Sequence, residues 1–275
     1  MTVGEILGVG WTITKSHLLP LGGVAVLVSA LSTVVTLGTL FLTGTLQTFA
    51  EAGWIDDVLA GTSTAVPSGI VLASLLGLLI TTIGGPVIAG MATAYAGARA
   101  LGKDGRGAVN ERLNGRWPVL LGVSVLVGVL VGVGLILLVV PGVFAYLILV
   151  LAAPIAVMER GAVGASLKRS AALTRGHRGR IIGAVLVTMI VGVVAGAVAS
   201  ALIGGLVGQA GSVGTLVLTQ FVSVLVGGVA AAWTGAVIAV LYIDIRIRAE
   251  HLDQALRQAA AAETGRVNPP IQQGW

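Results

Sequence analysis

The chain of 275 residues has no cysteine and few charged residues. The lack of cysteine excludes disulfides, thiolate-bound zinc, iron–sulfur clusters and cysteine nucleophiles. Only 10% of the residues are charged, whereas a soluble domain carries about 25%, so the chain cannot cover the surface of a soluble globule. Disorder of the whole chain is excluded too, because 56% of the residues are hydrophobic and disorder requires low hydrophobicity.

Residues that could carry chemistry are scarce as well. The sequence has no HExxH, GxSxG or Walker A motif. Its three histidines, at positions 17, 177 and 251, are far apart in the sequence and lack the clustered carboxylates of a metal site. Asp56-Asp57 is the remaining acidic pair of interest, and a solvated loop explains it best. We therefore predict no catalytic, cofactor-binding or metal-binding residue and no enzymatic activity.

The chain does contain long apolar runs. Four stretches are free of Asp, Glu, Lys, Arg and His, and they are Leu18–Ala50, Val58–Ala98, Trp117–Met158 and Ile181–Ile243. A membrane helix needs about 20 apolar residues, and the last two stretches are long enough for two helices each, with turns at Pro141-Gly142 and Gly208–Gly214. Such long uniform runs do not fit the short alternating strands of a β-barrel.

These stretches predict an all-α polytopic membrane protein with six transmembrane helices. We expect a single domain over residues 1–258, followed by a disordered cytoplasmic tail over 259–275 that contains Pro269-Pro270. The predicted spans cover about 19–46, 70–98, 119–140, 143–158, 181–207 and 216–243.

The charged residues in the loops set the orientation. With six crossings, all 16 Lys and Arg residues fall on one side of the membrane, and the other side holds only Glu51, Asp56 and Asp57. By the positive-inside rule both termini are cytoplasmic, and we predict a multi-pass protein of a bacterial cytoplasmic membrane. Because the basic residues are next to the spans, anionic lipid headgroups explain them better than nucleic acid does.

The spans group into three hairpins that enter from the same side. A shift of 160 residues aligns Val3…Thr14-Lys15…His17 with Val163…Thr174-Arg175…His177, which indicates either an internal repeat or a coincidence in a chain of biased composition. Both segments have the apolar and basic faces of interfacial amphipathic helices. We therefore expect such a helix before the first and the third hairpin.

Small residues recur every four positions along the fifth and sixth spans. This spacing lets helix backbones approach closely in lipid. It is used either for packing within the bundle, which we favour, or for a homodimer or moving interface. The candidate helix-packing residues are Gly192, Gly196, Ser200, Gly204 and Gly235. Pro86 and Pro154 lie inside predicted helices and should kink them.

Two charged segments flank the last hairpin. The segment between the fourth and fifth spans supplies the candidate contacts to lipid headgroups or to cytoplasmic partners, and these are Lys168, Arg169, Arg175, Arg178 and Arg180. After the sixth span, Asp244–Arg248 and Asp253–Arg257 are spaced as i,i+4 ion pairs. We expect the last helix to continue to about Gln258 and its charges to contact the basic segment.

Three stretches carry a family resemblance. They are Val3–Leu7, the middle motif from Pro141-Gly142 through Pro154 and Glu159–Gly161 to Leu173–Gly176, and the end Leu241–Asp253. In them the chain resembles the bacterial six-helix membrane family of the glycerophosphoryl diester phosphodiesterase membrane domain and the related YciC-like proteins. The resemblance implies an integral membrane module and transfers no catalytic residue. The soluble phosphodiesterase barrel of some relatives would need roughly 250 further residues.

Two functional hypotheses follow. The first is a scaffold or accessory factor of envelope or lipid-related machinery, with a protein partner or a homo-oligomer and no cofactor. The alternative is a transporter or channel for lipid or a small solute. No ionisable side chain lies inside a predicted span, which disfavours ion-coupled transport. A lined cleft between the helices would favour the alternative.

Overall fold

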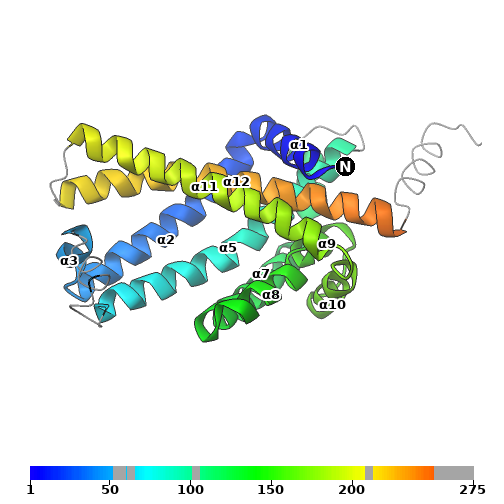
Figure 1. Cartoon of the computed structure of the whole chain (residues 1–275). Helices are drawn as coiled ribbons and strands as arrows, with labels where there is room; N and C mark the ends of the chain where they lie inside the picture. Colours follow the sequence, from blue (N-terminus) through cyan, green and yellow to red (C-terminus); the bar gives the residue numbers. More distant parts are fainter. Residues whose placement is uncertain (52–59, 61–65, 101–105, 208–212, 251–275) are drawn as a thin grey trace, which may run out of the picture.

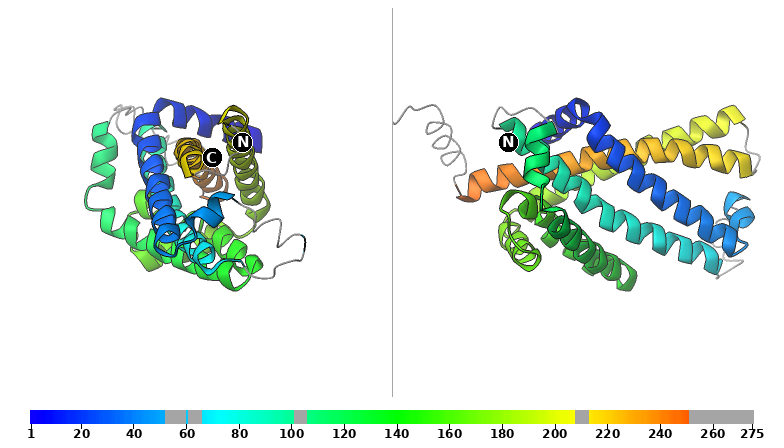
Figure 2. Two further views of the ribbon diagram at one scale, coloured as in Figure 1. Left: turned by 90° about the vertical axis from the view of Figure 1, so that its left-hand side faces the viewer. Right: turned by 180° about the vertical axis from the view of Figure 1, so that it is seen from behind.

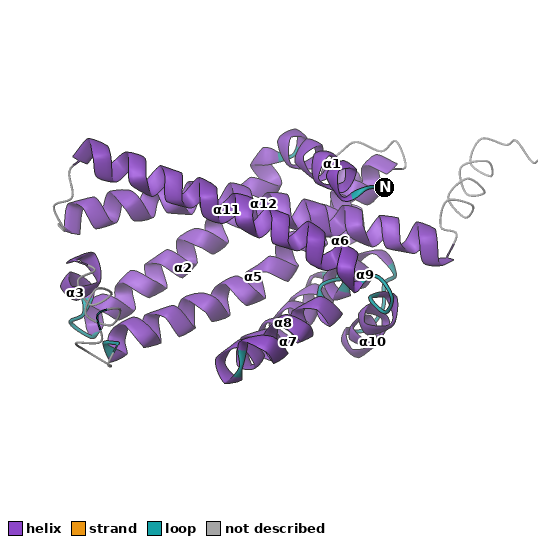
Figure 3. Cartoon of the chain, in the orientation of Figure 1, coloured by secondary structure: helices purple, strands orange, loops and turns teal. Residues whose placement is uncertain are grey.

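The computed structural model describes residues 1–51, 60, 66–100, 106–207 and 213–250. In this part of the chain all regular structure is helical (Figure 3). Six of its helical segments are long and apolar enough to cross a membrane, and they are Leu18–Leu42, Ser68–Arg99, Trp117–Leu137, Val139–Met158, Arg178–Ile203 and Val217–Ala249. The protein is therefore an all-α, multi-pass membrane protein, as the sequence predicts.

The described part of the chain forms the following helices. In chain order they are α1 (Val3–Ser16), α2 (Gly23–Leu42), α3 (Leu46–Glu51), α5 (Ser68–Ala100), α6 (Arg106–Leu113), α7 (Trp117–Leu137), α8 (Val139–Leu149), α9 (Ala152–Met158), α10 (Val163–Leu173), α11 (Arg178–Val207) and α12 (Val213–Glu250). A π-helical turn, Leu18–Gly22, joins α1 to α2.

Three hairpins make up the bundle, namely α2–α5, α7–α8 and α11–α12, and a short helix precedes each of them (Figures 1 and 2). The helix before the first hairpin, α1, begins with a capping box between Thr2 and Glu5. Thr14 in α1 and the equivalent Thr174, which caps the end of α10, are both fully buried, and each hydroxyl donates to the carbonyl four residues earlier. This correspondence supports the internal repeat.

The bundle is built around α12, which packs against α1, α2, α5 and α11. Glycines bring these helices into backbone contact. A Cβ on Gly228 would lie 2.9 Å from Cα of Val26 in α2, and a Cβ on Gly10 of α1 would lie 3.2 Å from the backbone nitrogen of Val237 in α12. Lipid provides no hydrophobic driving force between helices, so the close packing that these small residues allow stabilises the association of the helices.

The first two hairpin turns begin earlier than predicted. The span predicted over 19–46 ends at Leu42, because Gly44 adopts φ 68° and reverses the chain. The turn predicted at Pro141-Gly142 lies instead at Leu138, the single extended residue between α7 and α8. Pro141 lies in the first turn of α8, where the missing N–H costs no helical hydrogen bond.

The predicted fourth helix, 143–158, is two helices rather than one. The chain bends at Val150 and Leu151 between α8 and α9. Pro154 is in the first turn of α9, so it begins a new helix instead of kinking a continuous one. Pro86 does lie inside a continuous helix, α5.

Several predictions fall outside the described residues. They concern Asp56-Asp57, His251, the pair Asp253–Arg257, the end of the last helix at Gln258 and the tail 259–275. The last helix continues at least to Glu250, past the predicted span.

Candidate functional site

One end of the bundle gathers the basic segments, and we call it the basic end. It comprises α1, α6, α10, the first turn of α11 and the last turns of α12 (Figure 1). Asp244 of α12 is only 4% exposed there. Its carboxylate accepts from the amino group of Met1 at 3.0 Å, from Nε of Arg248 at 3.1 Å and from Arg180 of α11. The predicted Asp244–Arg248 pair is present, and the contact with the basic segment is made through Arg180.

A second carboxylate, Glu159, follows α9 and ties it to α10 and α12. Its Oε2 accepts from Nε of Arg169 at 3.2 Å, and its Oε1 accepts from the hydroxyl of Tyr242 at 3.1 Å. Nε of Arg246 lies 3.7 Å from Oε1, and Arg246 also donates to the Tyr242 hydroxyl at 3.0 Å.

These two clusters have the geometry of structural braces. Each carboxylate is held by at least two cationic groups from different segments of the chain. In partly buried surroundings, breaking such a network costs far more than breaking an exposed pair, because a charge is left without its counterpart. The braces hold the segments of the basic end together, and both carboxylates are engaged in ion pairs within the protein.

The five basic candidate residues therefore divide into three groups. Arg169 and Arg180 are engaged in the braces. Lys168 and Arg175 are exposed at the basic end. Arg178 differs from both, because its Nε is buried and has no hydrogen-bond partner.

Arg178 lies at the seam between α11 and α8. Its guanidinium is 4.9 Å from the ring centroid of Phe144 in α8, in a cation–π contact. Within the described part of the chain no carboxylate pairs with Arg178. In the described part of the chain the seam thus presents a cation that contacts an aromatic ring and no carboxylate.

The same two helices, with α5, α7 and α12, line a cleft of about 420 Å³ in the middle of the bundle. Its lining residues are Thr81, Thr82, Gly85, Pro86, Ala89, Val127, Val131, Tyr146, Val150, Met189, Ala231, Thr234, Gly235 and Ile238. Apolar side chains dominate, and the polar exceptions are hydroxyls. The cleft suits an apolar chain and offers no charged group to an ion.

One hydroxyl of the cleft has no hydrogen-bond partner among the described residues. Thr81, Thr82 and Thr234 donate to carbonyls of their own helices. The hydroxyl of Tyr146 makes no hydrogen bond to any described residue. Tyr146 is half-buried and lines the cleft, so its hydroxyl offers a donor to an acceptor oxygen there.

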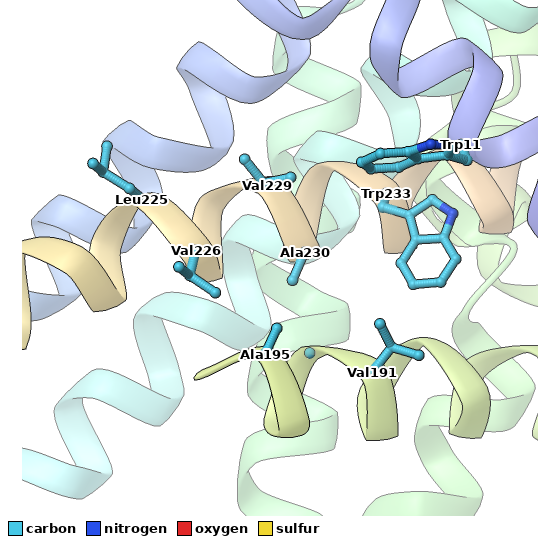
Figure 4. A pocket seen from close by; sticks show the side chains of 9 residues that line it. Trp11, Val191, Ala195, Leu225, Val226, Val229, Ala230 and Trp233 are labelled. Atoms are coloured by element: carbon cyan, nitrogen blue, oxygen red, sulfur yellow. The ribbon is translucent and has the colours of Figure 1, made fainter. Parts of the chain in front are cut away.

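A second hollow, a groove of about 510 Å³, runs between α11 and α12 (Figure 4). Small residues create it, because Ala195 of α11 faces Ala230 of α12 with little side chain between them. Trp11 and Trp233 close one end, with ring centroids 6.2 Å apart, and Nε1 of Trp233 donates to the carbonyl of Leu7 at 3.2 Å. The groove therefore presents only apolar surface.

The candidate packing residues have unequal surroundings. A Cβ on Gly235 would lie 2.8 Å from Cγ2 of Ile88 and 3.2 Å from the nitrogen of Ala89, so α5 and α12 touch there. A Cβ on Gly192 would meet Ala230 at an ordinary 3.4 Å. Gly196 has no neighbour within 4 Å, and Ser200 is exposed. The surroundings of Gly204 lie outside the described residues.

Sequence reasoning missed three residues of these sites. Tyr146 lies in an apolar span, but Tyr95 and Tyr242 do as well, so the sequence did not single it out. Phe144 gave no signal, because a cation–π contact needs a partner from another helix. Glu159 belongs to the resemblance motif, but its bonds to Arg169 and Tyr242 depend on how α9, α10 and α12 converge.

Residues 107–247 match the family described as a domain of unknown function, DUF7847. Since the match covers more than half of the chain, the chain belongs to this family. The matched range runs from α6 into α12, so it contains the α7–α8 hairpin, the Glu159 brace, Asp244 with its partner Arg180, and most of the cleft lining, but not Met1 or Arg248. No curated protein and no solved structure matches the chain.

Proposed function

We propose that this member of the DUF7847 family is a non-enzymatic protein of the bacterial cytoplasmic membrane that holds a phospholipid as an accessory factor of envelope or lipid-related machinery. The cleft carries the proposal. Its apolar lining fits an acyl chain, and Tyr146 offers a donor to an ester oxygen. Arg178, at the same α8–α11 seam, offers a charge to an anionic phosphate.

The distribution of charge supports the orientation of this site. In the proposed topology all 16 basic residues, and both termini, are on the cytoplasmic side. The basic end then faces the leaflet that is rich in anionic lipid. Arg175, three residues before Arg178 in the sequence, adds exposed positive charge at the basic end, which favours anionic over zwitterionic headgroups.

Photo-crosslinking tests the proposal at a residue of the cleft. A benzophenone amino acid replaces Met189, which lines the cleft and is 59% exposed. In a matched variant it replaces the neighbouring Ile190, which is similarly exposed at 52% but does not line the cleft. We expect Met189 to crosslink one anionic headgroup class above its share of the membrane, and Ile190 to crosslink lipids in proportion to the bulk. Identical lipid profiles at the two positions would refute a specific site.

Whether the protein also transports the lipid that it holds is a separate question, which an assay of lipid movement between the leaflets of liposomes answers. Purified protein is reconstituted with a fluorescent phospholipid, and its movement between leaflets is followed by dithionite quenching. Acceleration that is lost when Ala231→Phe fills the cleft indicates transport. Crosslinking at Met189 without acceleration indicates that the protein holds the lipid without moving it.

A scaffold that assembles through α11 is the second candidate. Gly196 and Ser200, one turn apart, leave part of α11 free for close approach by another helix. Because the chain has no cysteine, a single Ser200→Cys variant reports such contact directly. Oxidative dimerisation in membranes that is abolished by Gly196→Leu supports the scaffold, and a monomer under these conditions counts against it.

A further inference from the structure

The groove between α11 and α12 is narrow and is closed at one end (Figure 4). Its floor is formed where the two helices touch, because a Cβ on Gly192 would lie 3.4 Å from Cβ of Ala230. Trp11 and Trp233 form the closed end, and Leu225 lines the other end, eight residues earlier in α12. Eight residues of helix rise about 12 Å, so a groove of about 510 Å³ over this length has a mean cross-section of about 40 Å².

The two tryptophans at the closed end are held in place by two helices. Their rings meet edge to face at 78°, with the centroids 6.2 Å apart. Nε1 of Trp233 donates to the carbonyl of Leu7 in α1 at 3.2 Å, so α1 and α12 fix the pair together. A helix that lay along the groove would have to pass this pair, whereas a molecule that ends at the pair would not.

The closed end also carries positive charge. Nζ of Lys15 lies 5.2 Å from the ring centroid of Trp11, and the lysine is exposed. No carboxylate of the described ranges pairs with Lys15. Nε1 of Trp11 likewise donates to no described residue. An ammonium and an indole N–H are both hydrogen-bond donors, so this end suits an anionic group, while the rest of the groove is apolar.

We propose that the groove is a second lipid site. It holds one acyl chain of an anionic phospholipid between α11 and α12, and it holds the phosphate at Lys15 and Trp11. A phospholipid has the same order of apolar and anionic parts as the groove and its closed end. A helix of a partner protein fits less well, because a helix at least about 10 Å wide has a cross-section of about 80 Å², twice that of the groove.

This site is separate from the cleft of the proposed function. Met189 lines the cleft, whereas Val191 and Gly192 line the groove, so the two hollows are on different faces of α11. The inference depends on α1, α11 and α12 and holds whether or not the cleft binds a lipid. Since Lys15 is exposed and Nε of Arg178 is buried, we expect the groove lipid to exchange with the bilayer and to be lost on extraction in detergent.

Quenching of tryptophan fluorescence by brominated phospholipids tests the site in a bilayer. Phenylalanine replaces Trp54, Trp117 and Trp275 in the full chain, so that Trp11 and Trp233 are the remaining tryptophans. The protein is reconstituted in phosphatidylcholine with increasing fractions of brominated phosphatidylglycerol or of brominated phosphatidylcholine. We expect phosphatidylglycerol to bind about fivefold more tightly, which is the usual effect of one lysine near an anionic membrane surface.

Two pairs of variants separate the headgroup contact from the chain contact. Lys15→Gln should remove the preference for phosphatidylglycerol, and Lys15→Arg should keep it, because the charge is retained. Ala195→Phe, which fills the groove, should remove the preference too. Ala197→Phe, at an exposed position of α11 that does not line the groove, should keep it. A preference that survives Lys15→Gln or Ala195→Phe would overturn the proposal, as would equal quenching by the two lipids before these substitutions.

Photo-crosslinking gives a second measurement in the chain with all five tryptophans. A benzophenone amino acid replaces Leu225, which lines the groove and is 44% exposed, or Leu218, which is 41% exposed and does not line it. In vesicles with equal amounts of phosphatidylglycerol and phosphatidylcholine, Leu225 should capture an excess of phosphatidylglycerol that Lys15→Gln removes, and Leu218 should capture both equally. Capture of a second copy of the chain at Leu225 in place of lipid would overturn the proposal.

Discussion

The brace at Asp244 yields the most quantitative prediction. Asp244→Asn keeps the size of the side chain and removes its charge, which leaves Arg180, Arg248 and the amino group of Met1 without a carboxylate. Arg180→Gln removes one of three partners and leaves two. We therefore expect the first substitution to lower the free energy of unfolding more than the second.

The exposures set the size of the effect. The side chains of Asp244 and Arg180 are 5% and 26% exposed, so the pair lies between a surface pair and a fully buried one. Surface pairs contribute about 0.2–1 kcal/mol, and removing one partner of a buried pair costs about 3–5 kcal/mol. We expect a loss of about 3 kcal/mol for Asp244→Asn and a coupling energy of about 1–3 kcal/mol with Arg180→Gln.

Reversible unfolding in mixed detergent micelles, followed by tryptophan fluorescence, gives the four free energies of the double-mutant cycle. The double variant should lose less stability than the two single variants lose together. If the losses add to within about 0.5 kcal/mol, the two side chains act independently and the brace has no energetic role.

Three further predictions concern packing, the second brace and the cleft. Gly235→Leu should lower the free energy of unfolding by about 1–3 kcal/mol, because a leucine side chain has no room beside α5. As the control, Gly196→Leu should change the free energy of unfolding of the monomer by less than about 0.5 kcal/mol, because a Cβ at Gly196 meets no atom within 4 Å. Equal losses for the two variants in the same unfolding assay would contradict the packing at Gly235. Glu159→Gln should cost about 1–3 kcal/mol, and a smaller loss for Arg169→Gln would show that Tyr242 and Arg246 hold the remaining bonds to Glu159. Tyr146→Phe should weaken lipid retention about fivefold, the equivalent of about 1 kcal/mol for one hydrogen bond, and unchanged retention by mass spectrometry would show that the hydroxyl does not contact the lipid.

The helical membrane fold was predictable because it depends on composition and run length alone. Helix ends were predictable only where charge marks them, as at Arg99 and Arg178. Inside apolar runs they depend on single backbone angles and contacts. The chain turns at Leu138 rather than at Pro141, because proline is tolerated in the first turn of a helix, and the spacing of apolar residues says nothing about that choice.

The candidate site was predictable only in part. Sequence spacing predicts Asp244–Arg248, since the two residues are one helical turn apart. It cannot distinguish Arg178 from Arg180, although the first borders an open seam and the second is held by Asp244. Their difference arises from the packing of α11 between α8 and α12. The cleft is likewise a property of five helices together and of no single one.

Native mass spectrometry of the protein, extracted in mild detergent from its own membrane, tests the lipid-holding account most directly. We predict one retained phospholipid of an anionic headgroup class per chain, lost in Arg178→Gln and kept in Lys168→Gln, whose side chain is exposed and does not take part in the Arg178–Phe144 contact. A protein that carries no lipid, or whose lipids match the bulk membrane and are unaffected by Arg178→Gln, would contradict the account.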